Sequence, residues 1–392
     1  MKNIKEETSL NNKKILLRLD LNVPLVSDKI TDTTRIDKIL PTLKFLISQN
    51  TKIIIISHIG RPKGQVVNEL SLRPICQDLE IKLSQNIKLI SKDIKEITSK
   101  DLFNNDHEKI VVLENIRFYP EEEKNNPQFA KQLASLADIY VNDAFSCSHR
   151  AHASIDEITN FLPCYSGLQF DLEVGALKKI TSEIKKPITC IIGGSKVSTK
   201  INIIKNLIPK FDNIIIVGGM ANNIIKYNGN NIGKSLQEEN SDQIIKEIFF
   251  LSEKENCKIL YPQDVIVGEN LNGTPQIKGL NEISSDEMIL DIGPKTINTI
   301  NKIIDKSNTI LWNGPAGYFE NPSFANGSIE IAKKIIENNK SNKIYSVAGG
   351  GDTVSLLNSL NAVNDFNFVS TAGGAFLEYL EGKELPGIKA LN

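Results

Sequence analysis

Cysteine is scarce in this chain of 392 residues, and the few that occur lie far apart and form no C-x-x-C pair. A disulfide framework and a thiolate zinc site are therefore both disfavoured. Long apolar runs are also missing, since strictly aliphatic stretches such as Ile53–Ile56 are far shorter than the ~18 residues that a membrane helix needs. The cysteines are Cys76, Cys147, Cys164, Cys190 and Cys257.

An excess of charge of either sign is absent as well. The 46 Lys and Arg residues against 47 Asp and Glu residues leave a formal net charge of −1, which disfavours a general binder of nucleic acid or of membrane surfaces. The first seven residues hold no apolar signal core, and this favours a cytoplasmic protein. The length predicts about two or three compact units, each able to bury a core.

Several catalytic motifs are missing. The sequence contains no Walker A motif, no G-x-S-x-G nucleophile elbow, no H-E-x-x-H zinc helix and no H-R-D catalytic loop of protein kinases. The segment Gly349–Val354 gives G-x-G-x-x-V and so lacks the third glycine of the dinucleotide fingerprint. The sequence therefore disfavours the enzyme classes that depend on these motifs.

Arginine is confined to the first 150 residues, whereas lysine supplies the positive charge of the rest of the chain. Arginine presents a rigid bidentate fork that grips phosphate or carboxylate in a way that lysine cannot. Its confinement predicts an anion site in the first half, with chance scatter as the alternative. The arginines are Arg18, Arg35, Arg61, Arg73, Arg117 and Arg150, and the histidines of the same part are His58, His107, His149 and His152.

Short runs rich in isoleucine and valine alternate with longer helical patterns along the whole chain. Such runs are typical of buried parallel strands in βαβ units. Each is followed by Gly, Asn, Asp or cationic residues, at the strand end where ligands bind in open α/β sheets. We expect these strands at 15–21, 53–56, 110–113, 139–141, 188–192, 214–217, 310–312 and 344–347.

A helical pattern near the middle of the chain indicates a boundary between two α/β lobes. It starts at Gly167 and ends before Pro187, so we predict a helix over 166–186 that joins the lobes semi-rigidly. The N-terminal lobe is expected over 1–165 and the C-terminal lobe over 187–370, with a cleft between them.

Polar residues at the strand ends of the first half form a candidate site for a small molecule that bears phosphate and carboxylate groups. Parity places Arg18, Asp20 and Asn22 on one face of the first strand, although a surface strand alternates in the same way. His58 and Arg61 leave the second strand together, with a solvated loop as the alternative. A metal at the H-x-x-H of His149 and His152 is disfavoured, because two histidines at a spacing of three are a weak signal for a metal site. We place in this site Arg18, Arg35, His58, Arg61, Arg117, Arg150 and the two nearby histidines.

Glycines end three strands of the second half, at Gly193-Gly194, Gly218-Gly219 and Gly349–Gly351. A helical pattern follows each, so free backbone N–H groups and the positive end of a helix dipole are expected to hold phosphates there. Lys196 and Lys200 are spaced i, i+4, which predicts one helix face, although solvated helix lysines are common.

Two acidic residues are candidates near these glycines. The loop Asn313–Glu320 carries one acidic residue. Asp352 is a candidate ligand for Mg²⁺ in a nucleotide complex, or it serves the following helix alone as an N-cap.

These motifs resemble the phosphoglycerate kinase family as an ordered set that spans nearly the whole chain. In the first half the resemblance is carried by Arg18–Pro24, Ser57–Pro62, Leu113–Phe118 and His149–His152. In the second half it is carried by Gly193–Val197, Trp312–Pro315, Gly349–Thr353 and Leu380–Gly387.

The resemblance implies two Rossmann-like lobes, each a parallel β-sheet flanked by helices, with an interlobe cleft. It implies reversible phosphoryl transfer from 1,3-bisphosphoglycerate to ADP, giving 3-phosphoglycerate and ATP, in glycolysis and gluconeogenesis, by hinge closing of the lobes. Mg²⁺ bound with ATP or ADP is the implied cofactor, and the implied state is a monomer. The segment 371–392 is expected to pack back on the first lobe.

The resemblance also implies roles for individual residues. The residues implied to bind the substrate glycerate are Asp20, Leu21, Asn22, Arg35, His58, Ile59, Gly60, Arg61, Arg117 and Arg150. The residues implied to bind the nucleotide are Lys200, Asn313, Glu320, Gly350, Gly351, Asp352 and Thr353. Asp352 is implied to bind the metal that accompanies the nucleotide. The transferring group is surrounded by Arg35, Lys196, Lys200, Gly351 and Gly374.

The sequence departs from the family pattern at a few positions. Ile289 stands where the family commonly has a glycine along the nucleotide, so that contact is not carried over. Ala372 replaces a glycine, and the loop Gly314–Tyr318 is unusual at its fourth and last positions. Two other classes share parts of these patterns: an NAD-dependent dehydrogenase and a non-catalytic binder of nucleotides or anions.

Overall fold

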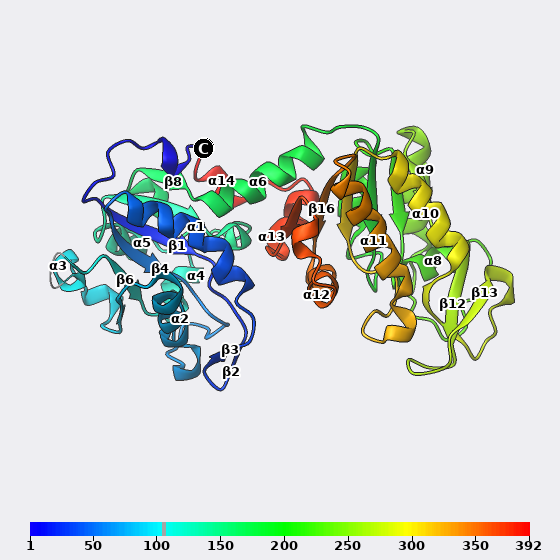
Figure 1. Cartoon of the computed structure of the whole chain (residues 1–392), viewed down its shortest axis with the longest axis horizontal. Coiled ribbons are helices and arrows are strands. Elements are labelled where there is room, and N and C mark those ends of the chain that lie inside the picture. The colour runs from blue at the N-terminus through cyan, green and yellow to red at the C-terminus, as the bar shows by residue number, and fades with distance from the viewer. Residues whose placement is uncertain (104–106) are drawn as a thin grey trace. The chain divides into compact units, whose positions relative to one another are not determined.

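The computed structural model describes residues 1–103 and 107–392. The chain forms two compact units, the first made of Met1–Gly175 with Glu384–Asn392 and the second of Ala176–Lys383. In Figure 1 the first unit runs from blue to green and includes the red C-terminal helix α14 (Pro386–Lys389). Within the described part of the chain, no helix combines the length and apolar character needed to cross a membrane.

The first unit is built on a six-stranded sheet with the order β5-β6-β4-β1-β7-β8, in which every pair is parallel. Its central strands are buried on both faces, which explains their continuous aliphatic sequences. The strands are β1 (Lys14–Leu19), β4 (Lys52–Ile56), β5 (Ile87–Ile90), β6 (Ile110–Leu113), β7 (Ile139–Asp143) and β8 (Cys164–Ser166).

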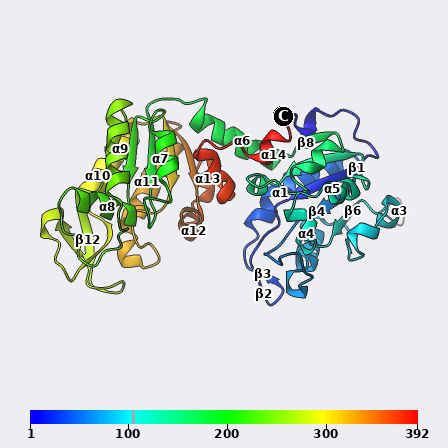
Figure 2. The same ribbon diagram turned by 180° about the vertical axis from the view of Figure 1, so that it is seen from behind.

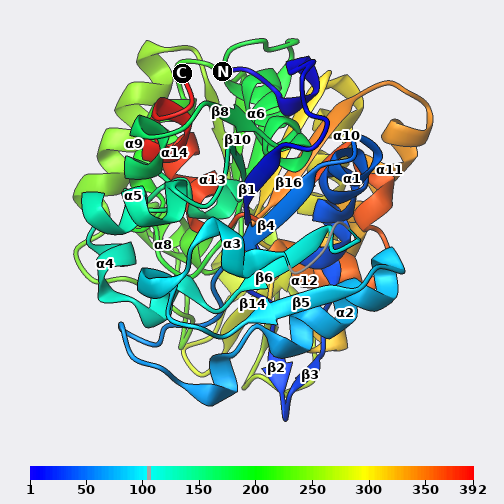
Figure 3. The same ribbon diagram turned by 90° about the vertical axis from the view of Figure 1, so that its left-hand side faces the viewer.

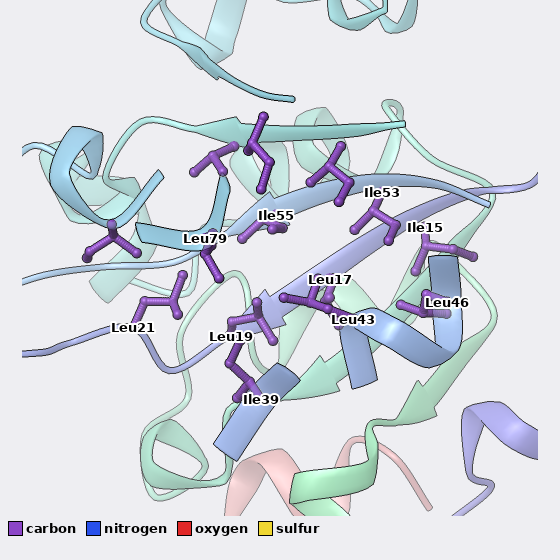
Figure 4. Packing of buried hydrophobic residues seen from close by; sticks show 14 of the residues in the cluster. Ile15, Leu17, Leu19, Leu21, Ile39, Leu43, Leu46, Ile53, Ile55 and Leu79 are labelled. Atoms are coloured by element: carbon purple, nitrogen blue, oxygen red, sulfur yellow. The ribbon is translucent and has the colours of Figure 1, made fainter. Parts of the chain in front are cut away.

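Helices cover both faces of this sheet (Figure 3). Figure 4 shows one face, where Ile39 and Leu43 of α1 lie against Leu17 and Leu19 of β1. The predicted parity of β1 is confirmed, and the surface-strand alternative is wrong because Arg18, on the other face, is also fully buried. The helices of this unit are α1 (Thr34–Ser48), α2 (Arg73–Leu83), α3 (Ser99–Leu102), α4 (Pro120–Glu123), α5 (Pro127–Ala134) and α14.

The second unit contains another parallel six-stranded sheet, with the order β11-β10-β9-β15-β16-β17. From β9 the chain continues to β10 and β11 on one side of the sheet, and from β15 it continues to β16 and β17 on the other side. The switch point of the topology therefore lies between β9 and β15. The strands are β9 (Ile188–Ile192), β10 (Asn213–Ile216), β11 (Lys258–Leu260), β15 (Thr309–Asn313), β16 (Tyr345–Gly349) and β17 (Phe368–Ser370).

Both faces of the second sheet carry helices. In Figure 1, α10 and α11 cover the face turned to the viewer, and in Figure 2, α7 and α9 cover the opposite face. Trp312 is fully buried in this core and stacks on Phe366, with 6.2 Å between the ring centroids. The helices are α7 (Ile201–Leu207), α8 (Gly219–Tyr227), α9 (Asp242–Lys254), α10 (Pro294–Lys306), α11 (Asn326–Lys340), α12 (Gly351–Ser359) and α13 (Gly374–Leu380).

Two smaller sheets were not predicted. An antiparallel sheet of order β13-β12-β14 lies in the second unit, and a two-stranded hairpin, β2 with β3, lies in the first. The strands are β2 (Leu25–Val26), β3 (Lys29–Ile30), β12 (Asp264–Gly268), β13 (Gln276–Gly279) and β14 (Met288–Ile292).

The helix predicted over 166–186 is shorter in the structure. It is α6 (Leu168–Thr181), and the boundary of the compact units falls within it, after Gly175. The N–H groups of Ser182 and Glu183 both bind the carbonyl oxygen of Lys178, which ends the helix. Pro187 disfavours helical geometry at the residue before it, so the pattern does not continue to 186.

The C-terminal segment joins the first unit at Glu384, later than the expected residue 371. Residues before it belong to the second unit, where Asn206 Nδ2 donates a hydrogen bond of 2.7 Å to the carbonyl oxygen of Leu380. In the first unit, Gly387 N donates to Ser148 O at 2.9 Å. A Cβ at Gly387 would lie 2.5 Å from Ser148 Oγ, so this contact requires glycine.

Candidate active site

The polar residues of the first unit gather at the carboxyl ends of adjacent strands. Asp20 and Asn22 follow β1, His58 follows β4, and Arg117 lies in the 3₁₀ turn Ile116–Phe118 after β6. Because β6, β4 and β1 are neighbours in a parallel sheet, these ends meet at one edge. This edge is the place that the strand pattern predicted for an anion site.

Arg35 reaches this edge from the first turn of α1. Its Nη1 lies 3.1 Å from a carboxylate oxygen of Asp20 and donates to the carbonyl oxygen of Asn22 at 3.1 Å. The side chain is 31% exposed, so the guanidinium is held in place while part of it stays open to solvent. Gly60 N donates to Asn22 Oδ1 at 2.9 Å, and this ties the loop after β4 to the loop after β1.

Arg117 is anchored on the other side of the same loop. Its Nη1 donates to the carbonyl oxygen of Gly60 at 3.2 Å, and its Nε lies 3.5 Å from Glu123 Oε1. Gly60 has a φ of +63°, and a Cβ there would lie 2.7 Å from Leu70 Cδ2, so the turn favours glycine. Arg117 therefore binds this turn directly, whereas Arg35 is joined to it through Asn22.

Arg18 does not line the open site, contrary to the prediction, because its side chain is fully buried beneath it. Its Nε donates to Ser154 Oγ at 3.0 Å, and its Nη2 lies 3.0 Å from His58 Nδ1. Since a guanidinium has only donors, His58 Nδ1 must accept, and the single ring proton is on Nε2. Burial, reinforced by the Arg18 and Arg117 charges, lowers the pKa of His58 well below its usual value.

A buried carboxylate completes this chain of contacts. Glu122 Oε1 accepts from Ser154 Oγ at 2.6 Å, and Oε2 accepts from Ser154 N at 2.9 Å. Burial raises the pKa of Glu122, while the Arg18 charge and the Ser154 bonds oppose that rise. Burial also lowers the pKa of His152 to about 4, and its Nδ1 lies 4.0 Å from Glu122 Oε1. Both imidazoles are therefore neutral near pH 7, and arginines supply the positive charge of the site.

The other predicted substrate residues are either exposed or buried. Arg61 and Arg150 are exposed, so their guanidinium groups are open to a ligand. Leu21 and Ile59 are buried in the apolar core, so their side chains are not placed to meet one. In the described residues, no three His, Cys, Asp or Glu side chains gather closely enough to hold a metal ion.

The second unit brings its glycine loops together at the carboxyl edge of its sheet. A Cβ at Gly193 would lie 2.3 Å from the carbonyl oxygen of Pro315, and one at Gly314 would lie 2.3 Å from that of Gly193. The loops after β9 and β15 are thus packed backbone against backbone. Gly193 N also donates to Asn313 O at 2.9 Å.

Lys200 and Asn313 connect these loops to the start of α12. Lys200 Nζ contacts Asn313 Oδ1, and Asn313 Nδ2 donates to the carbonyl oxygen of Gly349 at 2.7 Å. Burial lowers the pKa of Lys200. Gly350 precedes the helix with a φ of +97°, and the buried Thr353 Oγ1 accepts from Gly314 N at 2.7 Å.

Lys196 and Lys200 do not share a helix face, contrary to the prediction. The helix α7 begins only at Ile201, and the preceding residues form a turn in which Lys200 N donates to Val197 O. Ser198 explains the difference, because its N–H and hydroxyl both bind the carboxylate of Glu238 in place of helical partners. Lys196 is exposed on this turn.

Asp352 lies in the first turn of α12 and is exposed. The N-cap position is occupied by Gly350, so the alternative that Asp352 serves as an N-cap is wrong. An exposed carboxylate beside a glycine-lined helix start is the hard oxygen donor that Mg²⁺ prefers, so the residue fits the implied metal. Gly374 is the first residue of α13, which follows β17, and β17 is the neighbour of β16 in the sheet. The preceding residue, Gly373, has a φ of +54°.

A pocket of about 280 Å³ opens beside these loops, wholly within the second unit. Its polar lining includes Glu320 and Asp352, and its apolar lining includes Ile289, the residue that departs from the family pattern. Sequence reasoning missed most of the apolar lining, because these residues lie in loops and short strands without a periodic signal. The missed apolar and aromatic side chains include Leu236, Leu271, Met288, Tyr318 and Phe319, and the polar Asn222 of α8 was missed as well.

Comparisons with known proteins agree over nearly the whole chain. The phosphoglycerate kinase family model matches residues 5–383. A phosphoglycerate kinase of Wolbachia pipientis subsp. Culex pipiens is 46% identical over 387 residues, 98% of each chain. One of Zymomonas mobilis is 43% identical over 385 residues, 97% of each.

Solved structures agree as well. The structure of phosphoglycerate kinase from Coxiella burnetii matches with a TM-score of 0.91 at 38% identity, over 98% of this chain and 97% of that one. The enzyme from Pyrococcus horikoshii OT3 matches with a TM-score of 0.83 at 26% identity, over 100% and 98%. By sequence and by fold, this chain belongs to the phosphoglycerate kinase family.

Proposed function

We propose that the chain transfers a phosphoryl group reversibly from 1,3-bisphosphoglycerate to ADP, giving 3-phosphoglycerate and ATP, in glycolysis and gluconeogenesis. The observation that carries this proposal is the separation of chemistry between the units. One unit has a site lined by arginines, and the other has three glycine-lined helix starts and an apolar pocket beside them. Family membership supports the same assignment.

The first unit is proposed to hold the glycerate. Arg117 binds Gly60 and Arg35 binds Asn22, which is joined to Gly60, and the exposed Arg61 and Arg150 add charge that the phosphate of the substrate needs. His58 contributes a neutral Nε2–H donor because Arg18 occupies its Nδ1. Asp20, Asn22 and the backbone of Leu21 and Ile59 are proposed to orient the glycerate hydroxyl and carboxyl groups.

The second unit is proposed to hold the nucleotide. Its pocket takes the base, and the N–H groups at the start of α12, from Gly350 to Thr353, meet the phosphates. Lys200 and Asn313 lie beside that helix start, and Glu320 lines the same pocket. Mg²⁺, held with the nucleotide through Asp352, would neutralise phosphate charge.

Positioning and neutralisation of charge are the main tasks of the protein in this reaction. The accepting oxygen belongs to a carboxylate or to an ADP phosphate, and both are deprotonated at pH 7, so no general base is required. Arg35 from one unit and Lys196, Lys200, Gly351 and Gly374 from the other are proposed to surround the transferring group. Hinge closing of the units would bring these residues together and exclude water that would hydrolyse the acyl phosphate.

The test is ATP formation from ADP and 1,3-bisphosphoglycerate, with and without Mg²⁺. The proposal expects ATP that depends on all three. Binding of both substrates without ATP formation would indicate the non-catalytic binder instead. Absorbance changes at the NADH band with candidate substrates would indicate the dehydrogenase. The expectation of a monomer stays a prediction, which sedimentation analysis would check.

A further inference from the structure

Two adjacent asparagines of α8 are equally buried but differ in their hydrogen bonds. Asn222 and Asn223 are each 2% exposed. Asn223 Oδ1 accepts from Glu238 N at 2.8 Å and from Ser241 Oγ at 3.4 Å. Asn222 Nδ2 donates to Leu236 O at 2.9 Å, but its Oδ1 meets no hydrogen-bond donor among residues 1–103 and 107–392.

The contact with Leu236 identifies the unpaired atom of Asn222 as an oxygen. A carbonyl oxygen can only accept, so the side-chain atom that faces Leu236 O must be the nitrogen, and a flipped amide would oppose two acceptors. The remaining atom is therefore a buried acceptor without a donor. Such atoms are rare and destabilising in native proteins, and they call for an explanation such as a ligand.

Asn222 lines the pocket of the second unit, near the start of the helix that begins at the Gly218-Gly219 pair. It lies on α8, which follows β10, whereas Glu320 and Asp352 come from the segments after β15 and β16. The strand β9 separates β10 from β15 in the sheet. The pocket residues nearest to Asn222 in this arrangement include Leu236, whose carbonyl it binds and whose side chain is 54% exposed and free to shift as a ligand enters.

The partner of this oxygen must be a donor. Phosphate groups offer only acceptors at pH 7, so they cannot pair with it. The apolar residues of the pocket, such as Leu271 and Ile289, suit a flat base. Among the purine bases, adenine carries an amino group at position 6, whereas hypoxanthine and guanine carry a carbonyl oxygen there.

We infer that Asn222 Oδ1 accepts a hydrogen bond from the 6-amino group of adenine and selects adenine nucleotides over 6-oxopurine nucleotides. This inference rests on the proposed function, because it assumes that the pocket takes a nucleotide. A base without the amino group leaves the oxygen unpaired, and a 6-oxo base opposes it with a second acceptor. Discrimination should therefore be stronger against the 6-oxo base.

The experiment compares ADP, purine riboside 5′-diphosphate, IDP and 2′-deoxy-ADP by calorimetry with the unaltered chain. The same nucleotides are compared with the Asn222→Leu and Asn223→Ala variants. With the unaltered chain we expect about 10-fold weaker binding of the purine riboside nucleotide and a larger loss for IDP. In Asn222→Leu these ratios should fall towards one, and in the matched control Asn223→Ala they should stay.

Several results would overturn the inference. One is equal binding of ADP and the purine riboside nucleotide by the unaltered chain, which needs no folded variant. Another is a ratio that Asn222→Leu leaves unchanged. A loss confined to 2′-deoxy-ADP and dependent on Asn222 would assign the oxygen to the ribose instead. None of these results affects ATP formation by the unaltered chain, so failure of the inference and failure of the proposed function are distinguishable.

Discussion

The hydrogen bonds from Glu122 through Ser154 and Arg18 to His58 decide what the first unit can offer an anion. Each donor and acceptor in the series is fixed by its neighbour, because the arginine can only donate and the carboxylate can only accept. The result is a buried arginine that sets the tautomer of His58. The charge that a ligand meets comes from the more exposed arginines.

The state of His58 can be measured directly. We expect long-range ¹H–¹⁵N spectra to show a protonated Nε2 and an unprotonated Nδ1, without titration between pH 6.5 and 8. Because the pKa of His58 is lowered well below its usual value, the ring is already neutral at pH 6.5 and stays neutral as the pH rises. An imidazolium pattern for His58 at pH 7 would contradict the arrangement.

Arg35 is the arginine for which we predict the largest effect on catalysis. Arg35→Ala should lower kcat on the order of 10³-fold, as loss of an arginine that neutralises a transferring phosphoryl group does. The matched control is Arg73→Ala, since Arg73 is exposed on α2. A coupled assay that finds a near-normal kcat for Arg35→Ala, or equal losses for both variants, would reject the role.

At the scale of elements, the strands that the sequence predicted are those with uninterrupted aliphatic runs. All eight are present, in two parallel sheets, because central strands are buried on both faces. Edge strands such as β5 and β11 were missed, since one side of each lacks a strand partner and lysines interrupt or begin them. Short strands of this kind carry little periodic signal.

Site residues that depend on tertiary contacts could not be read from local patterns. The spacing of Lys196 and Lys200 suggested a helix, but Glu238 binds the intervening Ser198 from a distant part of the chain. Glu122 stands among three consecutive glutamates, and nothing in the sequence marks it as the buried one. Arg35 and Asp352 were candidates from the confinement of arginine to the first half and from the glycines before Asp352, and the family resemblance then implied their roles.

The C-terminal return offers a prediction about stability. Gly387→Ala should lower the free energy of unfolding by about 1 to 3 kcal/mol, because the new Cβ would press on Ser148. Gly175→Ala is the matched control, since nothing lies within 4 Å of a Cβ there and alanine favours helix α6. That variant should gain about 0.5 to 1 kcal/mol.

Urea unfolding of the two variants and the unaltered chain provides the measurement. An unchanged midpoint for Gly387→Ala would show that the contact with Ser148 relaxes without cost. A loss for Gly175→Ala equal to that of Gly387→Ala would show that the substitutions act through something other than the space around each Cβ.

At the scale of the whole molecule, the chain consists of two units that each have a core and a parallel sheet of their own. The predicted boundary helix is present, but the units divide within it rather than at its ends. The proposed reaction assigns one substrate to each unit. Its central claim is that the phosphoryl group passes directly from the ligand of one unit to the ligand of the other.

The most direct test is a single-turnover reaction with 1,3-bisphosphoglycerate labelled in its acyl phosphate, excess enzyme, ADP and Mg²⁺. Direct transfer predicts that the label appears in ATP, with little inorganic phosphate. When ADP is withheld, neither ATP nor 3-phosphoglycerate should form. Label released as inorganic phosphate at the same rate with or without ADP would contradict the account.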